Sequence, residues 1–206
     1  MDYNIVLAFS LATAVLAISP GPDNIFVLVQ SMVNGKKNGL AIVAGLMTGC
    51  LVHTTLLAFG VSALLKQSPT IYNGIKVFGA TYLLYLAFRV FKSSSSLVLE
   101  NTSIRENKFF KLYRQGFIMN VLNPKVTIFF LAFFPGFLFS DNLSNVIQFY
   151  VLGALFIIVS SMVFGTIAIL SGRIGTYLKS NSKVGLYLKW LQLIVFIALA
   201  VYVLIS

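Results

Sequence analysis

Apolar residues in this chain fall into six long blocks rather than into periodic stripes. The blocks cover roughly residues 4–33, 39–65, 70–91, 115–139, 144–171 and 185–205. Each block reaches the length of about 20 residues that a helix needs to cross the hydrocarbon core of a bilayer. A lone strand could not satisfy its backbone polar groups in lipid. The pattern therefore predicts an all-α integral membrane protein with six transmembrane helices.

Proline motifs interrupt the first and the fourth block. The first block contains SPGPDNIFVLV and the fourth contains VLNPKVTIFFL. Proline lacks an N–H and clashes with the preceding helical turn, so it ends or kinks a helix. Pro20 is expected to help break the first span, with Gly21 as the N-cap and Pro22 as the first residue of a second half-helix. Asn123 and Pro124 suit the same two positions in the fourth span. An ordinary proline kink is the alternative for either motif alone.

The two halves of the chain resemble each other in order. When Pro22 is aligned with Pro124, LLAFG at 56–60 also falls near SSMVFG at 160–165. Three spans is an odd number, so the second half must lie upside down relative to the first. The sequence thus predicts a single domain, residues 1–206, built as a 3+3 inverted repeat, a plan found in many secondary transporters. Its parts are the first repeat (1–91), a cytoplasmic linker (92–114) and the second repeat (115–206).

Charge is scarce and unevenly distributed. Only 10% of residues are charged, the mean hydropathy is +0.92 and the net charge is +10. Basic residues of membrane proteins gather in cytoplasmic loops, so this charge does not indicate nucleic-acid binding. The first, third and fifth connections carry most of the lysines and arginines: Lys36, Lys37, Arg89, Lys92, Arg105, Lys108, Lys111, Arg114, Arg173, Lys179, Lys183 and Lys189. The side that holds the termini has only Lys66 and Lys76, so both termini are predicted to lie outside.

Asp23 and Lys125 are the candidate binding residues. Asp23 is the one acid that falls within a predicted span, and Lys125 follows the proline of the fourth span. A charge at the bilayer centre costs about 2.5–3.5 kcal/mol, so it needs a partner, protonation or a water-filled cavity. Helix N-termini attract anions. We expect Asp23 to bind a substrate ammonium or a proton, and Lys125 to bind a carboxylate together with the half-helix N-termini. The alternative for Lys125 is snorkelling to the membrane surface.

Three further polar residues lie near these motifs or within a span. Asn24 and Asn120 could offer donors and acceptors to a substrate, or could satisfy the backbone of the broken helices. His53 could relay protons, but a buried hydrogen bond is the more common role of a lone histidine within a membrane span.

Several classes of protein are excluded. With one cysteine, Cys50, and one histidine, His53, the chain has no internal disulfide and no Cys/His metal cluster. It lacks a nucleotide phosphate loop and the G-x-S-x-G and H-E-x-x-H motifs. We therefore expect no enzyme, no cofactor and no metal. The N-terminal residues carry no basic stretch, so no cleaved signal peptide is expected.

The two motifs, the six spans and the length together resemble the LysE/RhtB family of amino-acid exporters. The resemblance implies export of amino acids or related metabolites across a bacterial inner membrane in exchange for protons. It assigns the two motifs to Pro20, Gly21, Pro22 and Asp23, and to Asn123, Pro124 and Lys125. The substrate would be a small molecule, and a homodimer is left open. A redox or metal-handling protein of the same superfamily, or a membrane scaffold without transport, is the alternative.

Overall fold

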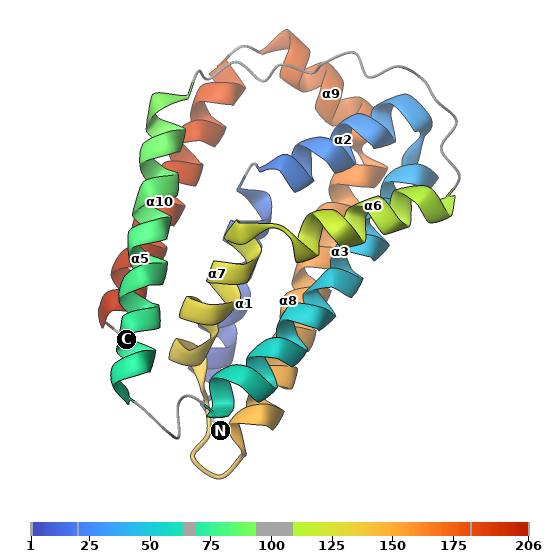
Figure 1. Ribbon diagram of the computed structural model, residues 1–206. Coiled ribbons are helices and arrows are strands. Elements are labelled where there is room, and N and C mark those ends of the chain that lie inside the picture. Colours follow the sequence, from blue (N-terminus) through green and yellow to red (C-terminus); the bar gives the residue numbers. More distant parts are fainter. Residues whose placement is uncertain (1, 20, 64–68, 94–108, 182, 206) are drawn as a thin grey trace.

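The structure is a computed structural model, which describes residues 2–19, 21–63, 69–93, 109–181 and 183–205 (Figure 1). Across these ranges the regular secondary structure is helical. The prediction of an all-α membrane protein is thereby confirmed at the level of secondary structure. Pro20, part of the second connection and most of the predicted linker lie outside the described residues.

The described residues form helices that follow one another along the chain. They are α1 (Tyr3–Ile18), α2 (Pro22–Asn34), α3 (Lys36–Leu56) with the π-helical turn η1 (Leu57–Val61), α5 (Pro69–Lys92), α6 (Phe109–Val121), α7 (Pro124–Phe133) with the 3-10 turn η2 (Phe134–Phe137), α8 (Asn145–Ile169), α9 (Ser171–Ser180) and α10 (Lys183–Ile205).

The described helices supply four to six candidate membrane spans. Four are long and apolar enough by themselves: Lys36–Val61, Thr70–Lys92, Asn145–Ile169 and Lys183–Ile205. The pairs α1/α2 and α6/α7 pass the same test only when each pair is taken together. The axes of α1 and α2 differ by 60°, and those of α6 and α7 by 50°.

Two helices differ from the predicted boundaries. The helix α6 begins at Phe109, inside the range 92–114 that the sequence assigned to the linker. The helix α9 occupies part of the connection before the last span. It is amphipathic, with Ile174 and Leu178 on one apolar face. Its short length and low mean hydropathy explain why a search for membrane-spanning blocks did not detect it.

Close helix packing depends on glycine where α3 meets α6. A Cβ atom on Gly45 would overlap the carbonyl of Tyr113, and one on Gly116 would overlap the carbonyl of Ile42. Small residues let two membrane helices approach to backbone contact in this way. The helix α8 packs against both α1 and α3, while α5 packs along α10.

A cluster of phenylalanines holds α7 in place below its first turn. The rings of Phe130 and Phe134 stack with centroids 4.2 Å apart, and Phe9 of α1 meets Phe134 edge-on at 4.9 Å. Phe156 of α8 packs against Phe130 at 5.0 Å. Aromatic pairs of this kind add to the stabilisation from burial. The start of α7 is therefore supported from α1 and α8, which fixes where Lys125 lies.

Candidate functional site

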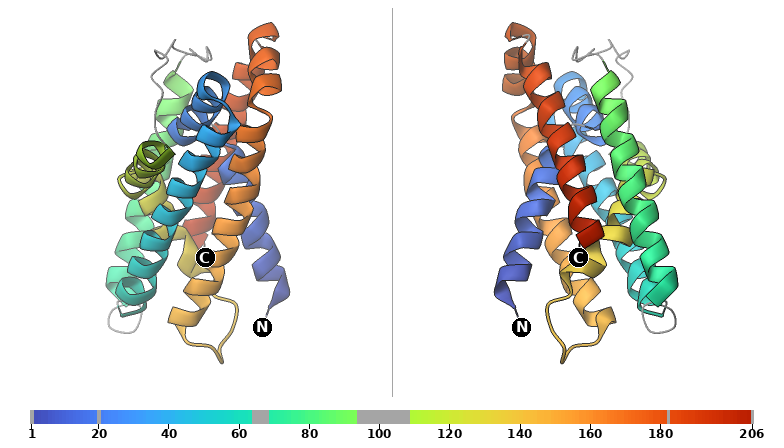
Figure 2. Two further views of the ribbon diagram at one scale, coloured as in Figure 1. Left: turned by 90° about the vertical axis from the view of Figure 1, so that its right-hand side faces the viewer. Right: turned by 90° about the vertical axis from the view of Figure 1, so that its left-hand side faces the viewer.

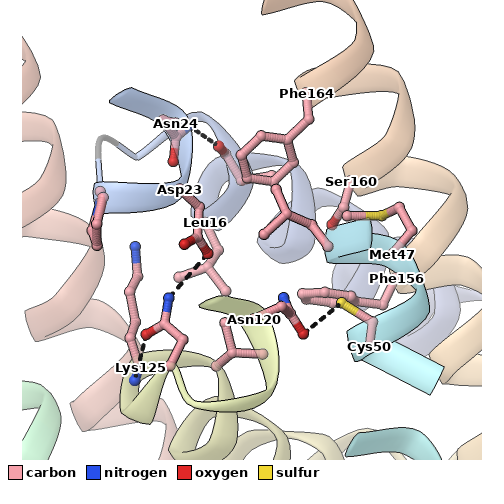
Figure 3. Close-up of a pocket in the computed structure, with 16 residues that line it drawn as sticks. Leu16, Asp23, Asn24, Met47, Cys50, Asn120, Lys125, Phe156, Ser160 and Phe164 are labelled. Atoms are coloured by element: carbon pink, nitrogen blue, oxygen red, sulfur yellow. Dashed lines mark hydrogen bonds between the residues drawn. The ribbon is translucent and has the colours of Figure 1, made fainter. Parts of the chain in front are cut away.

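The helices α2 and α7 begin at the same pocket (Figure 3). The pocket has a volume of about 50 Å³ and is also lined from α1, α3, α6 and α8. The sequence-predicted residues that line it are Gly21, Pro22, Asp23, Asn24, Asn120, Asn123 and Lys125. Pro124 begins α7 but does not line the pocket, and Pro20 lies outside the described residues.

Asn123 links the two motifs directly. Its Nδ2 donates to Oδ2 of Asp23 at 3.0 Å, and its Oδ1 accepts from the backbone N–H of Lys125 at 3.0 Å. The second contact is an N-cap, which satisfies one of the free N–H groups at the start of α7. One side chain thus caps α7 and binds the carboxylate of Asp23 in α2.

Asp23 lies in the first turn of α2 and is only 8% exposed. Gly21 is the N-cap there, in extended backbone, and no side-chain hydrogen bond caps the helix. A carboxylate near a helix N-terminus is stabilised by the helix dipole. The position of Asp23 is therefore electrostatically favourable even though it is buried.

Lys125 is half-buried and points toward the first motif (Figure 3). Its ammonium lies 5.0 Å from the centre of the Phe196 ring, a cation–π contact with α10. The same nitrogen would be 3.6 Å from a Cβ atom on Gly21. Among the described residues no ion pair joins Lys125 to Asp23 within 4.0 Å. The two opposite charges thus share one pocket without a direct contact.

Asn24 and Asn120 make contacts with their surroundings in the protein. Asn24 Nδ2 donates to the carbonyl of Ala17 at 2.7 Å, which joins the start of α2 to the end of α1. The amide oxygen of Asn120 accepts from Cys50 Sγ at 3.7 Å. Nε2 of His53 lies 3.1 Å from the carbonyl oxygen of Asn120. His53 therefore has the buried hydrogen bond that is the common role of such a histidine.

Sequence reasoning missed the apolar side of the pocket. The lining residues that were not predicted are Leu16, Ala17, Leu46, Met47, Cys50, Val126, Phe156, Ser160 and Phe164. The spacing of Phe156, Ser160 and Phe164 could have indicated that they share one face of α8, because residues four apart in a helix lie above one another. Their position opposite Asp23 depends on how the helices pack, so it cannot be predicted from the spacing alone.

The pocket combines one acid, one base and the N-termini of α2 and α7. A small zwitterion carries the complementary charges, an ammonium and a carboxylate. Within the described parts of the chain, no three His, Cys, Asp or Glu side chains are placed to hold a metal ion together.

Comparisons with known proteins place the chain among membrane transporters. The family model described as LysE type translocator matches residues 14–206. An uncharacterized membrane protein of Vibrio cholerae is 29% identical over 180 residues, which cover 87% of each chain. A homoserine/homoserine lactone efflux protein of Salmonella typhimurium is 27% identical over 183 residues, 89% of this chain and 88% of that protein. The protein of the same name from Salmonella typhi matches at the same identity. No solved structure matches the chain.

Proposed function

The chain belongs to the LysE type translocator family, and from this premise we propose that it exports an amino acid across the bacterial inner membrane in exchange for protons. The observation that carries the proposal is the pocket itself. Asp23 and Lys125 are far apart in the sequence, yet both line it at the start of a half-helix.

The electrostatics of the two half-helices support one orientation of the substrate. The positive end of α2 already has a carboxylate beside it, that of Asp23. Lys125 comes from the first turn of α7, and its ammonium extends to Gly21 at the start of α2, so the ammonium and the positive end of α7 can both attract an anion that lies between the two helix starts. The substrate carboxylate binds near Lys125, and the substrate ammonium binds to Asp23.

Proton coupling follows from the same carboxylate. Asp23 is buried, and its contact to a described side chain is the amide of Asn123. A proton or a substrate ammonium can neutralise it, but the two compete for the same oxygens. Exchange of one for the other as the site faces opposite sides couples export to proton entry.

The transport cycle requires the helices to move. A pocket of about 50 Å³ is several-fold smaller than the roughly 300–1,000 Å³ of small-molecule sites. The pocket must therefore widen before it can hold an amino acid. Substrate enters after α2 and α7 separate from α3 and α8 on one side of the membrane, and leaves after they separate on the other.

The packing of the helices supports the inverted repeat. In the proposed repeat, α1/α2 and α6/α7 are each one interrupted span, and α3 corresponds to α8. The contact of α3 with α6 then has its counterpart in the contact of α8 with α1. Contacts that come in such corresponding pairs are expected from two halves related by a pseudo-two-fold axis.

The distribution of basic residues supports an orientation with both termini outside. The start of α3, the C-terminal end of α5 and the whole of α9 lie at the end of the molecule away from the N-terminus (Figures 1 and 2). These segments carry basic residues, among them Lys36, Lys37, Arg89, Lys92 and Arg173. By the positive-inside rule that end faces the cytoplasm.

Transport by the purified protein in liposomes tests the proposal. Vesicles are loaded with amino acids, beginning with homoserine and homoserine lactone because two relatives are named for them. Efflux is measured with and without an opposing pH gradient. We expect the gradient to accelerate efflux in the wild type and to have no effect in Asp23→Asn.

The matched control is Asp141→Asn, which removes an exposed acid from the connection before α8. It should transport like the wild type. Full coupled transport by Asp23→Asn would show that the assigned role of Asp23 is wrong.

A further inference from the structure

One hydroxyl that lines the pocket has no hydrogen-bond partner in the described chain. Ser160 of α8 is 1% exposed, and its Oγ accepts from and donates to no described group. Three other buried hydroxyls share this property, those of Thr13, Ser19 and Ser62, but none of them lines the pocket. Buried polar groups are normally satisfied, so this one calls for an explanation.

Ser160 lacks the local hydrogen bond that several other helical hydroxyls in the described chain make. Ser31 donates to the carbonyl of Val27 at 2.6 Å, and Thr166, also on α8, donates to that of Met162 at 2.7 Å. Such bonds to the carbonyl four residues earlier satisfy a hydroxyl within its own helix. Ser160 makes no such bond; in Figure 3 its oxygen is turned toward the space that the labelled side chains surround.

The surroundings of Ser160 are apolar and uncharged. Met47, Phe156 and Phe164 line the pocket beside it. The charged side chains among the described lining residues are Asp23 and Lys125, which come from α2 and α7 on the other side of the pocket (Figure 3). The pocket thus has a charged side and an apolar side, and the apolar side contains a hydroxyl without a partner.

We propose that the α8 side of the pocket is a subsite for the substrate side chain, in which Ser160 hydrogen-bonds to a hydroxyl of a small, neutral amino acid. This inference rests on the proposed function, because it assumes that Asp23 and Lys125 bind the ammonium and the carboxylate. A basic or acidic side chain would find no opposite charge among Met47, Phe156 and Phe164, so the subsite rejects it.

A pair of isosteric amino acids tests the subsite. Homoserine and norvaline differ by a hydroxyl in place of a methyl group at the end of the side chain. Initial counterflow rates of both are measured in liposomes with the wild type, with Ser160→Ala and with Ser161→Ala. Ser161 is the next residue on α8 and does not line the pocket, so its variant is the matched control.

The wild type should transport homoserine about 2- to 10-fold better than norvaline, the range expected for one net hydrogen bond. Ser160→Ala should reduce this ratio to about 1 by slowing homoserine while norvaline is unchanged. Ser161→Ala should keep the wild-type ratio. The proposal is overturned if Ser160→Ala slows both compounds equally, or if it leaves the ratio as it was.

A wider panel separates this inference from the function on which it rests. If the wild type transports other amino acids but prefers norvaline to homoserine, the subsite is wrong and amino-acid export stands. If the wild type transports no amino acid at all, both proposals are wrong.

Discussion

The N-termini of α2 and α7 face one pocket but are built differently. At α2 the N-cap is Gly21, which offers no side chain, and the first turn carries an acid. At α7 the N-cap is Asn123, whose side chain accepts from the backbone, and the first turn carries a base. The N-terminus of α2 thus has no side-chain cap but carries a charge that the helix dipole favours. The N-terminus of α7 has a side-chain cap but carries a charge that the helix dipole disfavours.

This difference favours one orientation of a substrate in the pocket. A carboxylate in the first turn of a helix is stabilised by the helix dipole, whereas a cation there is disfavoured unless an anion lies nearby. The mismatch at Lys125 is partly offset by the ring of Phe196. A substrate carboxylate bound there would offset the remaining unfavourable electrostatic energy of Lys125. Ligand binding is therefore expected to stabilise Lys125 more than Asp23.

The largest effect on transport is expected from a substitution of Lys125, in the first turn of α7. Lys125→Gln removes the cation but keeps a long polar side chain. It should lower kcat/KM for amino-acid transport by roughly 30- to 1,000-fold, the loss expected when one partner of a buried charge contact is removed. Lys37→Gln removes an exposed lysine from the start of α3 and serves as the control. Equal rates for the two variants would contradict the role of Lys125.

The second largest effect is expected from substitutions of Asn123, because its side chain caps α7 and also donates to Asp23 in α2. Asn123→Ala should lower the free energy of unfolding by about 1–3 kcal/mol through the lost cap and the lost contact to Asp23. Asn123→Ser keeps an oxygen that can cap α7 but gives up the amide donor. It should recover most of the stability in thermal unfolding and little of the transport. Recovery of both would mean that the bond to Asp23 has no function.

Asn24 tests the contact that closes the first interruption. Its amide bonds to the carbonyl of Ala17 across the gap between α1 and α2. Asn24→Ala should cost about 0.5–1.5 kcal/mol in the free energy of unfolding, the net value of one hydrogen bond. Asn24→Asp is the companion variant, because it keeps the shape but not the donor. If both variants unfold like the wild type in denaturant, the contact does not hold the two helices together.

The smallest effect is expected at Gly21. Its backbone is extended, with φ at −156°, so a side chain causes no strain there. Gly21→Ser supplies the cap that α2 lacks and should stabilise the protein by only a few tenths of a kcal/mol. Transport should be nearly unchanged, since the added Cβ would meet the Lys125 nitrogen at an ordinary contact distance of 3.6 Å. A large loss of stability would contradict the uncapped start of α2.

The sequence predicted what depends on local pattern. Long apolar blocks predicted the helices, and a lone acid and a lone base inside such blocks identified Asp23 and Lys125 as candidates. Asn123 was predicted as the N-cap of its helix, and it is. Its second bond, to Asp23, joins residues that are distant in the chain and has no local signal.

Other features of the site depend on how helices meet, so the sequence did not reveal them. Ser160 is one of two adjacent serines in α8, and nothing in SSMVFG says which of them faces the pocket. The role of Asn24 was left open between substrate and backbone, and its bond to Ala17 is to the backbone. The binding roles of Asp23 and Lys125 stay predictions.

The most direct test of the central claim asks which charge on the substrate each residue binds. Transport of labelled homoserine is measured in competition with 3-amino-1-propanol, which has the ammonium and the hydroxyl but no carboxylate. The wild type should strongly prefer homoserine; Lys125→Gln should lose most of that preference, and Asp23→Asn should retain it in whatever transport remains. If Lys125→Gln discriminates between the two compounds as well as the wild type does, Lys125 does not bind the carboxylate and the account is wrong.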